Sequence, residues 1–226
     1  MIHIITDIER PRKELIDKFR AMSAATVHEA SGRKGAVDCG IKPVARGVRI
    51  CGPAFTAQCH PGDNLMLHKA LEKAQPGDVI VASVEGYYEA GYWGALMAIS
   101  GMAKNLGGLA IDGCIRDSEE IIEMGFPVFC RGFCIRGTTK TGSGLINHPT
   151  LFGGIVVNPG DLILGDDDGI VVVDRNMCEV VLKKSIDRVE AEKKKSARLQ
   201  AGTTSVELNK LESVFEWLGL TEDRSS

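Results

Sequence analysis

Short apolar runs alternate with segments of helical period through the first 175 residues of the chain. The apolar runs predict strands, and they lie at residues 44–59, 79–82, 109–111, 127–129, 155–157, 162–164 and 170–173. The segments between them predict helices after Pro11 and at residues 23–30, 65–74 and 94–103. This order predicts an α/β domain over residues 1–175 and a helical extension over residues 176–226.

The extension itself predicts two helices. Asn176-Met-Cys-Glu179 has the spacing of a capping box, and we expect the helix that it opens to reach about Leu199, with Gly202 as its stop. Ser205 is expected to cap a last amphipathic helix that continues to Leu218. A terminal pair of helices is a candidate contact between subunits.

Turns rich in glycine and aspartate separate the predicted strands. Gln75–Asp78 and Asn158–Asp161 each place Pro-Gly-Asp before a strand, which indicates a structural echo. Gly165–Gly169 holds three aspartates, but Asp-Gly between two apolar runs predicts a β-hairpin rather than a metal site. Gly52-Pro53 predicts a bulge or corner. Residues 131–147 predict a surface loop, with a lid over a site as the alternative.

The stretch from Gly107 to Glu120 carries the strongest candidate chemistry. Leu109–Ile111 predicts a buried strand, and Asp112-Gly113 predicts a turn directly after it. Asp117 has the D-x-x-E spacing of a helix cap, which is its plain interpretation. It also follows a strand end, where open α/β folds place their ligands, and Arg116 precedes it. A carboxylate beside a fixed cation suits an anionic substrate held next to a metal ion.

A second candidate is the helix predicted at residues 94–103, which opens with Gly94-Ala-Leu-Met97. The first turn of a helix leaves backbone N–H groups without partners, and the positive end of the helix dipole lies behind them. Such an end binds carboxylates and phosphates.

Composition excludes several classes of function. The 226 residues are 44% hydrophobic and 25% charged, with a net charge of -3 and no basic stripe, which argues against nucleic acid as a partner. No apolar run reaches membrane-spanning length and the N-terminal segment lacks a signal-peptide pattern, so we expect a cytoplasmic protein without a membrane partner. The seven cysteines include no C-x-x-C pair, which predicts buried free thiols rather than disulfides or a zinc site.

Taken together, Gly94-Ala-Leu-Met97, Gly108–Gly113 and Arg116-Asp117-Ser-Glu-Glu120 resemble the signature of a family of divalent-metal aldolases. Its members are 4-hydroxy-4-methyl-2-oxoglutarate / 4-carboxy-4-hydroxy-2-oxoadipate aldolases, and regulators of ribonuclease E activity are related to them. The resemblance covers nearly the whole chain. It implies a swivelling β/β/α sandwich that assembles into homotrimers or homohexamers, with sites at the subunit interfaces.

The resemblance also implies roles for individual residues. Asp117 would be the one protein ligand of Mg²⁺ or Mn²⁺, and Arg116 would face the 2-oxo oxygen of a 2-oxo acid substrate. The amides of Gly94, Ala95, Leu96 and Met97 would bind the pyruvyl carboxylate, and Asp112 would orient a water. The remaining polar site residues would be Glu29, Asn64 and Glu192, of which Glu192 comes from a neighbouring subunit. By pattern alone, the two glutamates are also explained as solvated charges.

The implied reaction is retro-aldol cleavage of 4-hydroxy-4-methyl-2-oxoglutarate and/or 4-carboxy-4-hydroxy-2-oxoadipate to pyruvate plus pyruvate or oxaloacetate. Oxaloacetate decarboxylation passes through the same enolate and is an expected side activity. No lysine lies in a strand context typical of a Schiff-base former, which favours the metal-dependent route. Lys140, Arg131 and Arg136 are candidate partners for a further carboxylate of the substrate.

Two alternatives stay open. The first is a non-catalytic regulator that binds ribonuclease E, and the second is a dedicated oxaloacetate decarboxylase. Asp117 and the long C-terminal extension favour the enzyme, because the regulators that the chain resembles lack both features.

Overall fold

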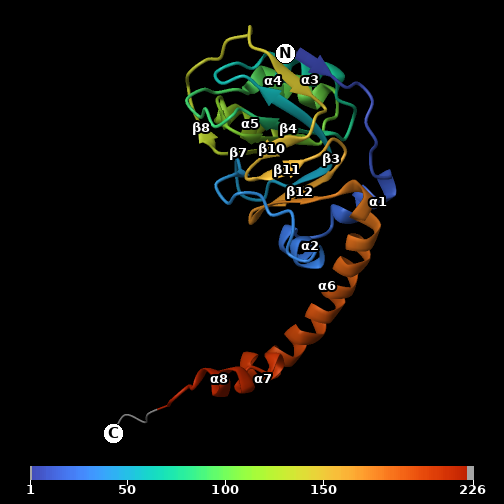
Figure 1. Cartoon of the computed structure of the whole chain (residues 1–226), viewed down its shortest axis with the longest axis vertical. Helices are drawn as coiled ribbons and strands as arrows, with labels where there is room; N and C mark the ends of the chain where they lie inside the picture. The colour runs from blue at the N-terminus through green and yellow to red at the C-terminus, as the bar shows by residue number, and fades with distance from the viewer. Residues whose placement is uncertain (1, 223–226) are drawn as a thin grey trace. The chain divides into compact units, whose positions relative to one another are not determined.

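The described residues, 2–222 of a computed structural model, contain a sheet of nine strands within the first of two units, Met1–Ser185 (Figure 1). Along the main path the strands lie in the order β1 (Ile2–Ile4), β9 (Gly144–Ile146), β3 (Ile50–Cys59), β4 (Val79–Ser83), β5 (Gly108–Asp112), β7 (Val128–Cys130) and β2 (Lys42–Pro43). Strands β3, β4, β5 and β7 are parallel, so their carboxyl ends share one edge of the sheet. This edge carries the pocket described below.

A helix follows each of the first three parallel strands. These helices are α3 (Leu65–Lys73), α4 (Ala95–Ala103) and α5 (Ser118–Met124). Phe55, Ile80 and Leu109 point to the helical face of the sheet, because alternate residues of a strand share a face. They form one apolar core with buried residues of all three helices, among them Leu67 and Ile121.

The other face of the main path of the sheet is covered by a second β layer, which includes β12 and β13 where they branch from β3. Ala54, Val81 and Ala110 pack there against the hairpin of β10 (Thr150–Phe152) and β11 (Ile155–Val157). They also pack against β12 (Leu162–Asp166) and β13 (Gly169–Val173). The far side of β12 and β13 buries α1 (Lys13–Phe19), α2 (Ala24–Ala30) and the first turns of α6 (Cys178–Gln200). The layers confirm the predicted α/β class and β/β/α sandwich (Figure 1).

Several predicted turns have a clear role in the sheet. β12 and β13 pair antiparallel from Leu162↔Val173 to Asp166↔Gly169, which confirms the hairpin. β3 runs without interruption through Gly52-Pro53, but its partner changes there from β12 to β4, so the predicted corner is a change of pairing. Gly52 is required at this point because a Cβ would lie 2.2 Å from the carbonyl oxygen of Gly77.

The predicted loop 131–147 is shorter than expected. Its first residues form β8 (Gly132–Phe133), which pairs with β6 (Cys114–Ile115), and its last residues form β9. Since β9 bonds to both β1 and β3, one end of the loop belongs to the main sheet.

The helix starts of the extension differ from the prediction. Asp174, not Asn176, supplies the cap, and it accepts a hydrogen bond from the amide of Asn176 at the 3₁₀ turn η1 (Arg175–Met177). The last helix is split into α7 (Ser205–Asn209) and α8 (Glu212–Leu218), and Thr204 rather than Ser205 forms the capping box with Glu207. The split follows from Lys210, whose left-handed backbone (φ 55°) ends α7.

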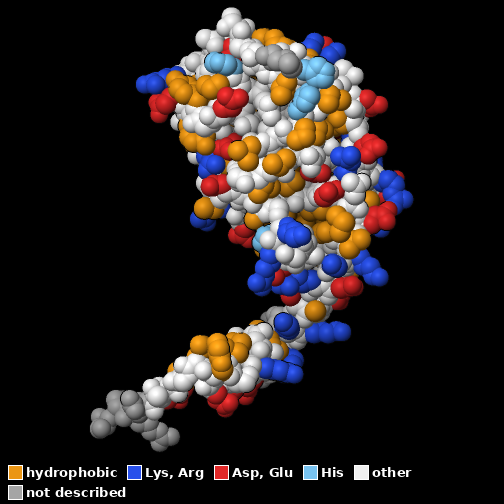
Figure 2. Space-filling model, in the orientation of Figure 1, with side chains coloured by type: hydrophobic (Ala, Val, Ile, Leu, Met, Phe, Trp, Pro, Cys, Tyr) orange, Lys and Arg blue, Asp and Glu red, His pale blue; other side chains and the backbone are white. Residues whose placement is uncertain are grey.

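The second unit, Ile186–Ser226, holds the rest of α6 together with α7 and α8. Hydrophobic side chains gather on the surface of α7 and α8 (Figure 2), and Trp217 is 83% exposed. On the face of the first unit drawn in Figure 2, acidic and basic side chains are interspersed. No helix among residues 2–222 is long and apolar enough to cross a membrane. All seven cysteines are free thiols, as predicted, but the prediction that they are buried is wrong for Cys39, which is exposed, and for Cys134, which is partly buried.

Candidate active site

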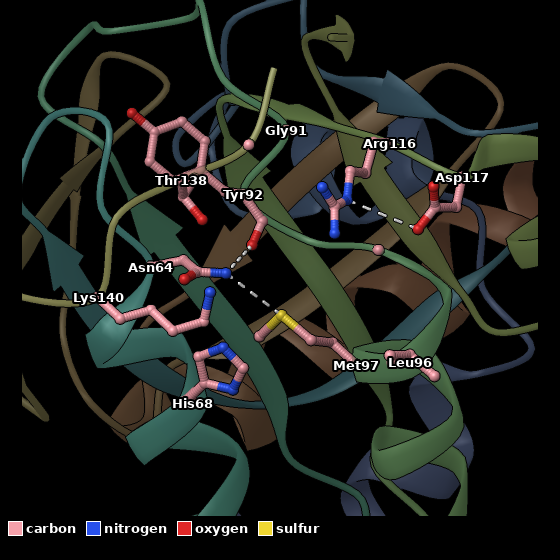
Figure 3. Close-up of a pocket in the computed structure, with 12 residues that line it drawn as sticks. Asn64, His68, Gly91, Tyr92, Leu96, Met97, Arg116, Asp117, Thr138 and Lys140 are labelled. Carbon is pink, nitrogen blue, oxygen red and sulfur yellow. Dashed lines mark hydrogen bonds and ion pairs between the residues drawn. The ribbon is translucent and has the colours of Figure 1, made fainter. Parts of the chain in front are cut away.

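A pocket of about 240 Å³ lies beyond the carboxyl ends of β3, β4 and β5 (Figure 3). Segments that follow these strands supply most of its wall, and the loop after β8 supplies the rest. The lining residues are Asn64, His68, Gly91, Tyr92, Gly94, Leu96, Met97, Arg116, Asp117, Gly137, Thr138 and Lys140. The outer edge of parallel strands is where α/β folds bind ligands, so the fold and the pocket agree.

Asp117 stands at the N-cap position of α5 but does not act as a cap. Its backbone is left-handed (φ 56°, ψ 37°), and its side chain makes no bond to its own helix. One carboxylate oxygen, Oδ2, instead accepts a hydrogen bond of 3.1 Å from the amide of Ala95 at the start of α4. The helix begins directly after Asp117, as the D-x-x-E spacing predicts, but the predicted capping bond is absent and the carboxylate contacts the neighbouring helix instead.

Arg116 accompanies this carboxylate at the rim of the pocket. Its Nε lies 3.7 Å from Asp117 Oδ2, and the two side chains are 48% and 38% exposed. The remaining guanidinium nitrogens face the pocket in Figure 3. A cation and a carboxylate therefore share one rim, as the sequence predicts.

Gly94 is required by this arrangement. A Cβ there would lie 2.5 Å from Asp117 Oδ2 and 3.2 Å from Arg116 Nε. Its backbone (φ -137°) is open to any residue, so the requirement is for space and not for a special conformation. The amide of Met97 donates to the carbonyl of Gly94. Two of the four amides predicted to bind substrate, those of Ala95 and Met97, are thus engaged within the protein.

Asn64 forms the opposite wall with a buried, unpaired acceptor. The residue is 6% exposed, and its Nδ2 donates to the carbonyl of Tyr92 at 2.9 Å. This bond fixes the orientation of the amide, because a flipped amide would place oxygen against oxygen. Oδ1 is buried and has no hydrogen-bond partner among the described residues. A buried acceptor of this kind calls for a donor from water or from a ligand.

Tyr92 holds this wall in place. Its hydroxyl donates to the carbonyl of Tyr87 and accepts from the amide of Gly62. Burial raises the pKa of Tyr92 to about 12, so the hydroxyl stays protonated at neutral pH.

Lys140 and His68 complete the wall that faces Arg116 and Asp117 (Figure 3). Burial, together with the nearby charge of Lys140, lowers the pKa of His68. Of the three cations predicted for a further substrate carboxylate, Lys140 lines the pocket. Arg131 is instead paired with Asp112 and Asp38, and Arg136 is paired with Glu89.

Three predicted site residues lie elsewhere. Both oxygens of Asp112 are occupied, since Oδ1 accepts from Arg131 and Tyr88 and Oδ2 accepts from the amide of Gly153. Asp112 does not line the pocket, because these contacts hold it to the second β layer. Glu29 lies on α2, beside β13, with its carboxylate 3.2 Å from Arg33. Glu192 lies in the second unit, 2.8 Å from Arg188, and its role in a neighbouring subunit stays a prediction.

Tyr92, His68 and Thr138 line the pocket and Asp63 supports the loop that carries Lys140, but none of the four was predicted as a site residue from the sequence. For Asp63 a signal exists. Pro61-Gly62-Asp63 repeats the Pro-Gly-Asp turn seen twice elsewhere in the chain. The aromatic and histidine positions have no comparable pattern.

Comparison with known proteins identifies the family. The model of the RraA-like family, described as Aldolase/RraA, matches residues 13–172, which include every lining residue of the pocket. The chain therefore belongs to the RraA-like family, which confirms the resemblance seen in the sequence. It is 40% identical over 174 residues to a Halalkalibacterium halodurans protein named "Putative 4-hydroxy-4-methyl-2-oxoglutarate aldolase", and the match covers 76% of this chain and 82% of that protein.

Solved structures share the fold. An uncharacterized protein from Pseudomonas syringae superposes with a TM-score of 0.78 at 25% identity, covering 90% of this chain and 98% of that one. RraAS2 of Streptomyces coelicolor, described as an unusual member of the RNase ES inhibitor RraA protein family, superposes with a TM-score of 0.76 at 29% identity. That match covers 84% of this chain and 99% of RraAS2.

Proposed function

We propose that this protein is a divalent-metal-dependent aldolase that cleaves 4-hydroxy-4-methyl-2-oxoglutarate and/or 4-carboxy-4-hydroxy-2-oxoadipate and releases pyruvate. The observation that carries the proposal is the Asp117 carboxylate, which its own helix does not use and which stands beside Arg116 at the rim of the pocket. The name of the 40% identical relative supports the same reaction class.

The donor set fits Mg²⁺ or Mn²⁺. Asp117 offers Oδ1, for which the structure describes no protein partner, at a rim that water reaches. Magnesium sites commonly use one or two carboxylates and complete their shell with water and substrate oxygens. Among residues 2–222, no group of three or more His, Cys, Asp and Glu side chains is placed to hold a metal ion, so Asp117 would be the lone protein ligand. When bound, the ion would act as a Lewis acid on the 2-oxo acid.

Each of the pocket residues then has a separate role toward the substrate. The guanidinium of Arg116 lies where it can stabilise the negative charge that develops on the 2-oxo oxygen as the C3–C4 bond breaks. Gly94 leaves room for the Asp117 carboxylate and for Arg116 at this point, and the start of α4 favours the carboxylate of the substrate. Asn64 Oδ1 accepts a hydrogen bond from the hydroxyl on C4, and Lys140 binds the carboxylate at the far end.

The electrons balance without an external oxidant. The C4 hydroxyl gives its proton to water and becomes a carbonyl, and the C3–C4 pair moves to C3 as the pyruvate enolate. Protonation of C3 then yields pyruvate. Oxaloacetate decarboxylation gives the same enolate, so we propose it as a side activity of the same site.

Assembly belongs to the same proposal. A homotrimer or homohexamer would allow Glu192 to reach the site of a neighbouring subunit. The exposed apolar residues of α8, among them Trp217 and Leu218, support a subunit contact in the extension.

The test is pyruvate release from both hydroxy-oxo acids and from oxaloacetate, with EDTA and after re-addition of Mg²⁺ or Mn²⁺. We expect turnover of at least one hydroxy-oxo acid, its loss with EDTA and its return with metal. Turnover that persists in EDTA would contradict the metal assignment. Turnover of oxaloacetate alone would indicate a dedicated decarboxylase.

A non-catalytic regulator is the second candidate, and the likeness to RraAS2 favours it. Ribonuclease E cleavage of a fluorescent RNA, measured with and without excess protein, separates the two functions. Inhibition of cleavage without any pyruvate release would support the regulator and overturn the aldolase.

A further inference from the structure

Three turns of the chain share the sequence Pro-Gly-Asp. They are Pro61–Asp63, Pro76–Asp78 and Pro159–Asp161. The glycines are left-handed, with φ values of 72°, 88° and 86°. In each turn the amide of the aspartate donates to the carbonyl three residues before it, at 3.0, 3.0 and 3.1 Å. The three backbones therefore form the same turn, and their carboxylates can be compared directly.

Two of these carboxylates close their own turn. Asp78 Oδ2 accepts from the amide of Gln75 at 2.9 Å, and Asp161 Oδ2 accepts from the amide of Asn158 at 2.9 Å. Asp63 makes no such bond among the described contacts. Its carboxylate is directed away from the turn, so this member of the set serves a different purpose.

Asp63 fastens the loop between β8 and β9. Its Oδ2 accepts from the hydroxyl of Thr139 at 2.7 Å and from the amides of Thr141 and Gly142 at 2.6 and 2.9 Å. Its Oδ1 accepts from the amide of Leu65 at the start of α3. One buried carboxylate, 2% exposed, thus joins the loop to the helix that follows β3.

Backbone contacts strengthen the same junction. The amide of Asn64 donates to the carbonyl of Thr139, and the amide of Thr139 donates to the carbonyl of Gly62. A Cβ on Gly142 would lie 2.9 Å from Asp63 Cβ, so the loop passes too close for any other residue. Lys140 stands between the anchored positions, and the loop is a fixed wall of the pocket.

We propose that Asp63 is a positioning residue, which fixes Lys140 at the pocket and thereby sets the affinity for the substrate carboxylate remote from the 2-oxo group. The inference rests on the proposed function for the identity of the substrate. Asp63 itself lines no part of the pocket. Asp63 acts through the loop and touches no reacting atom.

Asp63→Asn is the primary test, because it keeps the size of the side chain and places an amide against N–H donors. We expect KM for 4-carboxy-4-hydroxy-2-oxoadipate to rise about tenfold with kcat nearly constant, since one charge-assisted contact to the substrate is lost. The inhibition constant of pyruvate, which lacks the distal carboxylate, should be unchanged. Lys140→Met should raise KM to a similar extent.

The double variant decides whether Asp63 acts through Lys140. If it does, Asp63→Asn raises KM by less than about twofold in the Lys140→Met background. An undiminished rise in that background overturns the proposal. Asp161→Asn is the matched control, because it changes the same turn at similar burial (3% exposed) away from the pocket, and its KM should stay constant. An equal change of KM in this control also overturns the proposal.

Hydrogen exchange separates this inference from the proposed function. The amides of Thr141 and Gly142 should exchange at least about tenfold faster in Asp63→Asn than in the native chain. In Asp161→Asn their exchange rates should be unchanged. If exchange follows this pattern but the protein has no aldolase activity, the role of Asp63 in holding the loop is supported and only the proposed reaction is overturned. Unchanged exchange overturns the anchor. Thr139→Ala, which removes one of the four side-chain bonds, gives a milder variant with a smaller shift in the same direction.

Discussion

Two aspartates that lie five positions apart, Asp112 and Asp117, have opposite surroundings. Asp112 ends β5 and accepts three hydrogen bonds, from Arg131, Tyr88 and the amide of Gly153. Among the described residues, Asp117 accepts one, from the amide of Ala95, and its side chain is 38% exposed against 15% for Asp112. The difference shows that the number of protein donors, more than residue type, separates a structural carboxylate from one that is available to a ligand.

The backbone explains how the two differ. Asp112 continues a strand, so its side chain lies among the residues that join the sheet to the second β layer. Asp117 has a left-handed backbone, which costs on the order of 1 kcal/mol for a residue other than glycine. Such conformations concentrate at functional sites, and here the conformation directs the carboxylate to the rim of the pocket.

The largest effect is expected for Asp117→Asn. Asparagine tolerates the left-handed backbone and has the same size, so the melting temperature should change by less than about 2 °C. Removal of the charge should lower pyruvate release by about 1,000-fold, because the metal ligand and the partner of Arg116 are lost together. The measurement pairs initial rates with thermal unfolding. A variant that keeps most of the activity in Mg²⁺ would reverse the assignment of the two aspartates.

Gly94→Ala should have the next largest effect. The added methyl group would meet Asp117 Oδ2 at 2.5 Å, so the carboxylate must move away from Ala95 and Arg116. We expect kcat/KM to fall by about 30-fold with little change in stability, since the backbone of residue 94 is open to alanine.

Gly137→Ala is the comparison for this variant. Its methyl group would lie 3.8 Å from Arg116 Nη1, an ordinary contact, so kcat/KM should fall by less than about threefold. Equal losses in the two variants would show that bulk in the pocket matters and that the position of Asp117 does not.

Asp112→Asn should affect stability more than turnover. The substitution weakens a half-buried ion pair with Arg131, whose side chain is 21% exposed. The free energy of unfolding should fall by about 3 kcal/mol, because Arg131 keeps only Asp38 as a carboxylate partner. Urea unfolding measures this loss. If activity falls strongly while the free energy of unfolding hardly changes, Asp112 would instead have the role of orienting a water.

The sequence predicts the α/β class and the longer strands of the sheet, because strands buried on both faces leave continuous apolar runs and helices leave a period of 3.6 residues. The β/β/α layering follows only from the resemblance to the family. The sequence also predicts Arg116 and Asp117 at one rim, since both follow a strand end. It does not predict which carboxylate is hydrogen-bonded to protein donors. That depends on Gly153, which meets Asp112 from 41 residues away, and such pairing has no local signal.

The prediction fails most clearly where two capping signals compete. Asp174 and Asn176 both suit a cap, and so do Thr204 and Ser205. In both cases the earlier residue is the cap, and a shift of one or two positions follows. For Asp117 the spacing of a capping box is present and the bond is absent. Contact with α4 overrides the local pattern there.

The smallest predicted effect compares carboxylates that the fold occupies, Asp63 and Asp161. Burial alone would raise the pKa of Asp63, but the bonds from Leu65, Thr139, Gly142 and Thr141 outweigh it and lower the pKa from 3.8 to about 2. A carboxyl group whose pKa is lower in the folded state stabilises the fold above its unfolded pKa and loses this contribution as pH falls through the folded value. Relative to Asp63→Asn, the native chain should therefore lose on the order of 1 kcal/mol of unfolding free energy between pH 6 and pH 3.

Asp161 should show the opposite sign. Burial raises its pKa in spite of the bonds from Asn158 and Arg175, so protonation favours its folded state. Its contribution to the free energy of unfolding is greatest below the unfolded pKa and is lost as pH rises through the folded pKa. The native chain should therefore become more stable relative to Asp161→Asn as pH falls. Urea unfolding of both variants at pH 6, 4 and 3 measures the two slopes. Slopes of equal sign would mean that the bonds to the loop do not outweigh the burial of Asp63, and the contrast between the two turns would then rest on geometry alone.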